Sequence, residues 1–99
     1  MEDILQRVQI WYSAHCDGDW EHQYGVSIST IDNPGWEVTI DFDQTPLSDI
    51  KFESITINRT EENWLRCFVK DDQFKGFGGT NNLSEILTIF LDWAKQKGK

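Results

Sequence analysis

No Lys or Arg occurs in the stretch from Asp17 to Ile50, although this stretch makes up a third of the chain. It holds eight carboxylates, whereas the other 65 residues hold nine acids and nine bases and have no net charge. Like charges crowded on a small domain repel one another and oppose compaction. The imbalance therefore predicts either a negative surface kept for a positive partner or acidity that only aids solubility. The eight residues are Asp17, Asp19, Glu21, Asp32, Glu37, Asp41, Asp43 and Asp49.

The chain also has few cysteines and no long apolar run. Cys16 and Cys67 are its only cysteines, and without CxxC spacing they predict no disulfide framework. No apolar run approaches the roughly 18 residues that span a bilayer. The acidic residues 1–5 lack the pattern of a secretory signal. These absences predict a reduced, soluble, cytoplasmic protein.

The net charge and the aromatic content narrow the class further. A net charge of −8 and an isoelectric point near 4.5 argue against unaided binding to nucleic acid or to an anionic membrane, whose phosphates attract Lys and Arg. Five Trp and six Phe supply the apolar area of a folded core. A chain of 99 residues is large enough for one core, so residues 1–99 are expected to form a single domain.

Hydrophobic periodicity predicts a helix near each end of the chain. Apolar side chains recur at helical spacing in residues 3–16 and again in residues 83–94. Asn82 and Glu85 have the spacing of a capping pair at the start of the second helix. The region between the two helices shows a different period.

That region alternates apolar and polar residues, as half-buried strands require. Asp32-Asn33-Pro34-Gly35 indicates a tight hairpin turn between the first two of these segments. Residues 76–79 are interpreted as a loop into the second helix, because they lack the Gly-Lys-Ser/Thr ending of a phosphate-binding loop. The alternating segments are 24–29, 36–43, 52–59 and 64–70, followed by a shorter one through Phe74 and Phe77.

This order of elements predicts an α+β fold, an antiparallel sheet of four to five strands flanked by an N-terminal and a C-terminal helix, both on one face. The second face of the sheet would then be open. Trp64 and Phe68 fall on that face without an explanation; a dimer contact, a partner contact or a covered face would each account for them. The residues expected there are Ser27, Ser29, Glu37, Thr39, Asp41, Thr56, Asn58, Trp64 and Phe68.

The run from His15 to His22 concentrates groups that could bind a metal ion or carry protons. Its spacing matches none of the standard metal-binding patterns. A small metal-dependent enzyme built on the segment Asp17-Gly18-Asp19-Trp20-Glu21-His22 is one alternative. In the structural alternative, Trp20 fills the edge of the core and the acids bind backbone amides. A nucleophilic Cys16 is disfavoured because carboxylates and no cations surround it in sequence. No catalytic residue, metal ligand or cofactor is assigned.

The acidic stretch itself is the strongest candidate for function. Period two places Glu37, Asp41 and Asp43 on one strand face, and the loop at residues 17–21 enters the sheet where that strand ends. These carboxylates are therefore expected to form one negative surface, with a Trp as its aromatic anchor unless that Trp belongs to the core. The predicted partner-binding residues are Asp17, Asp19, Trp20, Glu21, Trp36, Glu37, Asp41 and Asp43.

Several unusual runs cover nearly the whole chain. They are Trp11-Tyr12, Cys16-Asp17-Gly18-Asp19-Trp20-Glu21-His22 and Asp32-Asn33-Pro34-Gly35-Trp36, and they continue through Gly78-Gly79 and Asn82-Leu83 to Trp93. Together these runs resemble the immunity protein 53 family of bacterial polymorphic toxin systems.

The resemblance implies a small, non-catalytic, cytoplasmic protein that is made beside a toxin and protects its producer by binding that toxin. An acidic surface would suit a basic toxin domain, for example a nuclease, whose active cleft it could fill. A generic interaction module that involves no toxin stays open as a further interpretation.

Overall fold

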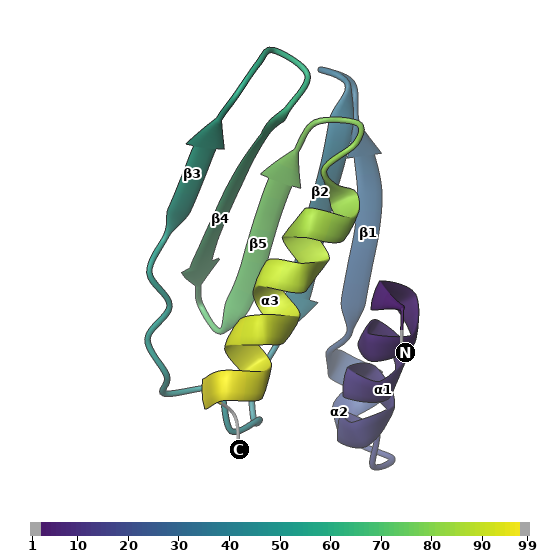
Figure 1. Ribbon diagram of the computed structural model, residues 1–99. Helices are drawn as coiled ribbons and strands as arrows, with labels where there is room; N and C mark the ends of the chain where they lie inside the picture. The colour runs from purple at the N-terminus through teal and green to yellow at the C-terminus, as the bar shows by residue number, and fades with distance from the viewer. Residues whose placement is uncertain (1–2, 98–99) are drawn as a thin grey trace.

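The computed structural model describes residues 3–97 and shows a five-stranded antiparallel sheet with helices on one side (Figure 1). Residues 1 and 2, part of the N-terminal segment considered above, and residues 98 and 99 lie outside this description. The strand order is β1-β2-β5-β4-β3. The elements are α1 (Ile4–His15), α2 (Trp20–Gln23), β1 (Val26–Ile31), β2 (Gly35–Asp41), β3 (Ile55–Asn58), β4 (Trp64–Lys70), β5 (Gln73–Gly78) and α3 (Leu83–Lys97).

The predicted α+β fold is confirmed, but β5 is the central strand, so the loop predicted at residues 76–79 is wrong for residues 76–78. Gly76 pairs with Val38 of β2 and with Cys67 of β4. A Cβ atom at this position would overlap the side chain of Ile86 in α3. The glycine therefore lets α3 lie close against the middle of the sheet, a common role for glycine within a strand.

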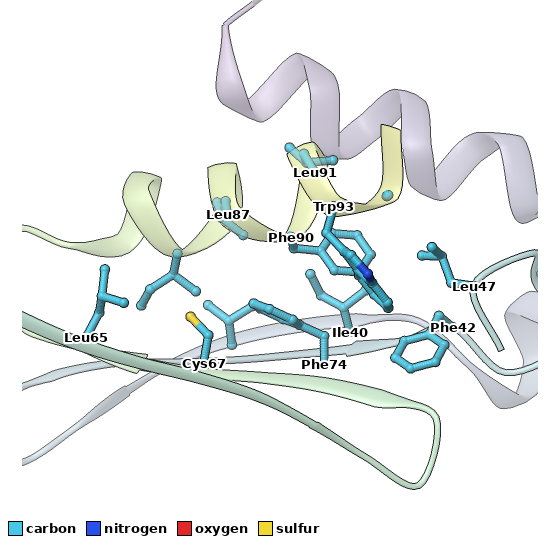
Figure 2. Packing of buried hydrophobic residues seen from close by; sticks show 13 residues of the cluster. Ile40, Phe42, Leu47, Leu65, Cys67, Phe74, Leu87, Phe90, Leu91 and Trp93 are labelled. Carbon is cyan, nitrogen blue, oxygen red and sulfur yellow. The ribbon is translucent and has the colours of Figure 1, made fainter. Parts of the chain in front are cut away.

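The core lies between the sheet and α3, as Figure 2 shows. The rings of Phe74 and Phe90 meet with centroids 5.2 Å apart, and Trp93 packs edge-on against Phe42 at 5.4 Å. Such tilted and edge-on pairs add to the free energy gained from the area they bury. The side chains buried most completely are Val38, Ile40, Phe42, Leu47, Leu65, Cys67, Phe74, Ile86, Leu87 and Phe90.

Helix α1 packs against α3 on the same side of the sheet and none of its residues is fully buried. It begins with a capping box, in which the Asp3 carboxylate accepts a hydrogen bond from the Gln6 backbone N–H (2.8 Å) and the Gln6 side chain accepts one from the Asp3 N–H (3.3 Å). Ile4, Val8 and Trp11 pack against the core, and the Trp11 ring meets Phe90 edge-on at 5.0 Å. The helix is therefore held along one stripe and leaves the rest of its surface to solvent.

The opposite face of the sheet carries no helix among the described residues. Phe68 of β4 stacks on Phe77 of β5 there, with ring centroids 6.2 Å apart, and the Arg66 guanidinium lies 5.1 Å from the Phe68 centroid. Cross-strand aromatic and cation–π contacts of this kind stabilise a sheet surface. They account for Phe68 on the open face without requiring a partner.

Candidate partner-binding surface

The backbone of the loop between α1 and α2 is held by two carboxylates, Asp17 of the loop itself and Glu21 of α2. Asp17 Oδ1 accepts hydrogen bonds from the backbone N–H groups of Asp19 and Trp20, both at 2.9 Å. The Glu21 carboxylate accepts from the N–H groups of Asp17 and Gly18, at 2.9 Å for each shorter bond. Hydrogen bonds from backbone N–H groups lower the pKa of both carboxyl groups. For Asp17 the donors are Trp20 and Asp19. Asp17 and Glu21 therefore fit the structural alternative, in which the acids bind backbone amides.

Trp20 is only 4% exposed, so it fills the edge of the core, as the structural alternative predicts, and offers little surface to a partner. Its indole N–H donates to the backbone carbonyl of Asp43 at 2.9 Å. Its ring lies about 6 Å from the rings of Trp11 and Tyr24, at 6.0 Å and 5.9 Å. A large ring with one polar group gains most from burial when that group finds an acceptor. Trp20 consequently ties the loop to the residues that follow β2.

Asp41, at the end of β2, also has a structural role. Its Oδ2 accepts from the Gly25 backbone N–H at 2.9 Å and its Oδ1 from the Gln73 side-chain amide at 2.7 Å. The Asp41 backbone N–H donates to the Gly25 carbonyl at 3.0 Å. These bonds bring the start of β1 beside the end of β2, where the sequence places them.

Further carboxylates gather at the same end of the sheet, which we call the acidic end. The turn between β4 and β5 consists of Asp71 and Asp72, both in the left-handed conformation (φ 54° and 59°). The Asp72 carbonyl accepts from the Phe42 backbone N–H at 3.0 Å, which fixes the turn beside the end of β2. The acidic end comprises Asp41, Asp43, Asp49, Asp71 and Asp72, all exposed or half-buried.

The carboxylates of the acidic end repel one another, and the effect falls on Asp72. Burial and then the charges of Asp43, Asp49 and Asp71 raise the pKa of Asp72. The two ion pairs among the described residues, Arg7–Asp92 and Arg59–Glu85, lie elsewhere and neutralise none of these carboxylates. The acidic end therefore presents uncompensated negative charge.

Two predicted contact residues, Trp36 and Glu37, lie away from the acidic end. Glu37 is on the open face beside Phe77, about 13 Å along β2 from Asp41 by the usual rise per residue. Trp36 is on the helix-covered face, where its indole N–H donates to the Thr80 carbonyl at 2.9 Å. The structure thus brings Asp43 to the loop at residues 17–21 and Asp41 to Gly25 just beyond it, but does not bring Trp36 and Glu37 to the same surface.

Asp71 and Asp72 are the residues that the sequence prediction missed, because they lie outside the stretch that lacks bases. The sequence feature that could have indicated them is their position as a two-residue turn between neighbouring strands. Such a turn favours residues that tolerate a left-handed conformation. Their place beside Asp41 depends on β5 pairing with β2, a pairing between strands far apart in the chain.

The described residues contain no group of three or more His, Cys, Asp or Glu side chains arranged to hold a metal ion. Around the run considered for a metal enzyme, the Cys16 thiol donates to the Tyr12 carbonyl at 3.3 Å and His15 Nδ1 lies 2.8 Å from the Trp11 carbonyl. The metal-enzyme alternative therefore gains no support from the geometry. Within residues 3–97, no helix is both long enough and apolar enough to span a bilayer.

Comparison with known protein families identifies a match over most of the chain. A family model described as Immunity protein 53 matches residues 5–95, from the first turn of α1 to the last turns of α3. No curated protein and no solved structure matches the chain.

Proposed function

The chain belongs to the Immunity protein 53 family, and on that premise we propose that it neutralises a cognate toxin in the producing cell by binding a basic surface of that toxin with its acidic end. The family match over nearly the whole described fold carries the proposal. The role of an immunity protein requires tight, fast binding and no chemistry.

Charge supports the choice of the acidic end. A basic partner would relieve the repulsion among Asp43, Asp49 and Asp72. The electrostatic free energy released in this way would add to the binding free energy. Complementary charge also raises the association rate, which matters for an inhibitor of a toxin that acts once it is free. Asp19, which is exposed at the neighbouring loop, would extend the same surface. The cytoplasm of the producer is the proposed place of binding.

The test uses the C-terminal domain of the toxin encoded beside the gene for this chain. Co-expression of the chain should prevent growth arrest by that domain. The triple variant Asp43→Asn, Asp49→Asn, Asp72→Asn should associate about tenfold more slowly at low salt and with a weaker salt dependence. Asn keeps the shape of each side chain and tolerates the left-handed turn position.

A matched control removes three charges at the other end of the sheet. The variant Asp32→Asn, Glu61→Gln, Glu62→Gln changes exposed residues of the loops β1–β2 and β3–β4. We expect its association rate to stay within about twofold of the unchanged chain. Equal slowing by both triple variants would remove the acidic end from the proposal, and failure of the unchanged chain to protect cells would remove toxin neutralisation itself.

A further inference from the structure

Strand β1 forms an outer edge of the sheet that lacks the usual protection (Figure 1). Its six residues, Val26–Ile31, include no charge and no proline. The four central residues are exposed, and Ile28 is 39% exposed. Edge strands generally carry Lys, Pro or a bulge that prevents pairing with another chain. The other edge strand, β3, is only four residues long.

Three residues of β1 have backbone N–H and C=O groups that point away from the sheet. The Gly25 carbonyl accepts from the Asp41 N–H, and the β1–β2 register continues without a break to Ile31 and Gly35. Because residues of an antiparallel pair alternate between bonding their partner and facing away, Val26, Ile28 and Thr30 direct their N–H and C=O groups away from β2. Among residues 3–97, no group forms a hydrogen bond to these three N–H and three C=O groups.

A side-chain pocket lies directly beside this edge. It is a groove of about 250 Å³ between α1 and β1, and Tyr12, which forms one wall, is 36% exposed. Strand addition draws its affinity from main-chain hydrogen bonds and its specificity from pockets for alternate side chains. The groove would accept one apolar side chain from the helix side of an added strand. It is lined by Val8, Gln9, Tyr12, Gly25 and Val26.

We propose that β1 accepts an extended, basic segment of the cognate toxin as a sixth strand of the sheet, an inference that rests on the function proposed above. The segment places an apolar side chain in the groove between α1 and β1. Its Lys or Arg residues lie beyond the Gly25 end of β1, next to the acidic end. A second copy of this chain fits the edge less well, because its own β1 lies in the stretch without Lys or Arg and would bring no cation to the carboxylates.

Proline substitutions at the two edges provide a matched test. Thr30→Pro removes an outward N–H of β1 and places a ring where the added strand would lie, without breaking a bond to β2. Thr56→Pro does the same on β3, where the bond from the Arg59 N–H to the Asn63 carbonyl and the register place Thr56 outward. Thr30→Pro should weaken binding of the toxin domain by about tenfold or more, whereas Thr56→Pro should change it by less than about twofold.

Hydrogen exchange of the unchanged protein gives a second measurement that needs no variant. In the complex, the amides of Val26, Ile28 and Thr30 should exchange slowly, while those of Thr56 and Asn58 should stay fast. Binding of the toxin domain with fast exchange at β1 or with no effect of Thr30→Pro would overturn strand addition and leave the acidic end as the contact. No binding at all would overturn both proposals. Protection of the same amides in the free protein, together with a dimer in size-exclusion chromatography, would assign the edge to a second copy instead.

Discussion

Replacing Asp41 with Ala should destabilise the fold, because this carboxylate joins three strands. It accepts one hydrogen bond from the Gly25 N–H at the start of β1 and one from the Gln73 side chain at the start of β5. A hydrogen bond to an ionised group contributes roughly 1.5–3 kcal/mol when it is well shielded. Asp41 is only half-buried, so water will replace part of each bond and we expect a total loss of about 2–3 kcal/mol. That loss corresponds to roughly 10–20 °C in Tm for a domain of this size.

The assay is urea unfolding followed by Trp fluorescence, with Asp41→Asn and Asp49→Ala alongside. Asn keeps one acceptor but turns an NH2 group toward the other donor, so its loss should be intermediate, about 1–2 kcal/mol. Asp49 is exposed, so its replacement should change stability by less than about 0.5 kcal/mol. A loss for Asp41→Ala no larger than that for Asp49→Ala would refute the structural role. If the role holds, weaker toxin binding by Asp41 variants would report on the fold and not on a contact.

Three further predictions concern the core, the acidic end and the thiols. Gly76→Ala should lower the free energy of unfolding by about 2–4 kcal/mol, because its methyl group must displace Ile86; a loss below about 0.5 kcal/mol in guanidinium unfolding would contradict this packing. Asp72→Asn should raise Tm at pH 7, since a raised folded-state pKa means that ionising Asp72 costs stability, and the gain should vanish below the unfolded value of 3.8; an equal gain at pH 3 and pH 7 would rule out charge as its cause. Burial raises the pKa of Cys67 to about 12, so only the exposed Cys16 should react with a thiol reagent in the folded protein and both thiols after unfolding; rapid reaction of two thiols in the native state would contradict the burial.

Much of the fold could be predicted because most of its helices and strands show a hydrophobic periodicity within their own sequence. Alternation from Trp36 to Asp43 and from Trp64 to Lys70 gave two strands whose buried positions the structure confirms. The last helix was predicted from a continuous apolar stripe. In β5, by contrast, Phe74 is followed at the next two inward positions by Gly76 and Gly78, so the side chains that would mark the rest of the inner face are missing. The glycines of β5 make sense as strand residues only in the tertiary structure, where α3 packs against them through Ile86.

The candidate surface was predictable to a smaller degree. That the end of β2 would lie near the loop at residues 17–21 followed from a hairpin between neighbouring strands. The structure places Asp43 against Trp20 of that loop and Asp41 against Gly25 just beyond it. The burial of Trp20 could not be read from its neighbours, because it depends on Trp11 from α1 and on the Asp43 carbonyl beyond β2.

By itself, the sequence determined the class of the protein: its charge, the stretch without bases, the two helices and the family to which it belongs. These properties are local or additive, so each can be counted along the chain. Only the tertiary structure decided which carboxylates share a surface, because the pairing of β2 with β5 brings Asp72 to Asp43 across nearly thirty intervening residues. It also decided that the Asp41 carboxylate binds the Gly25 backbone amide and that the β1 edge stays unpaired. Both depend on contacts between segments that are distant in sequence.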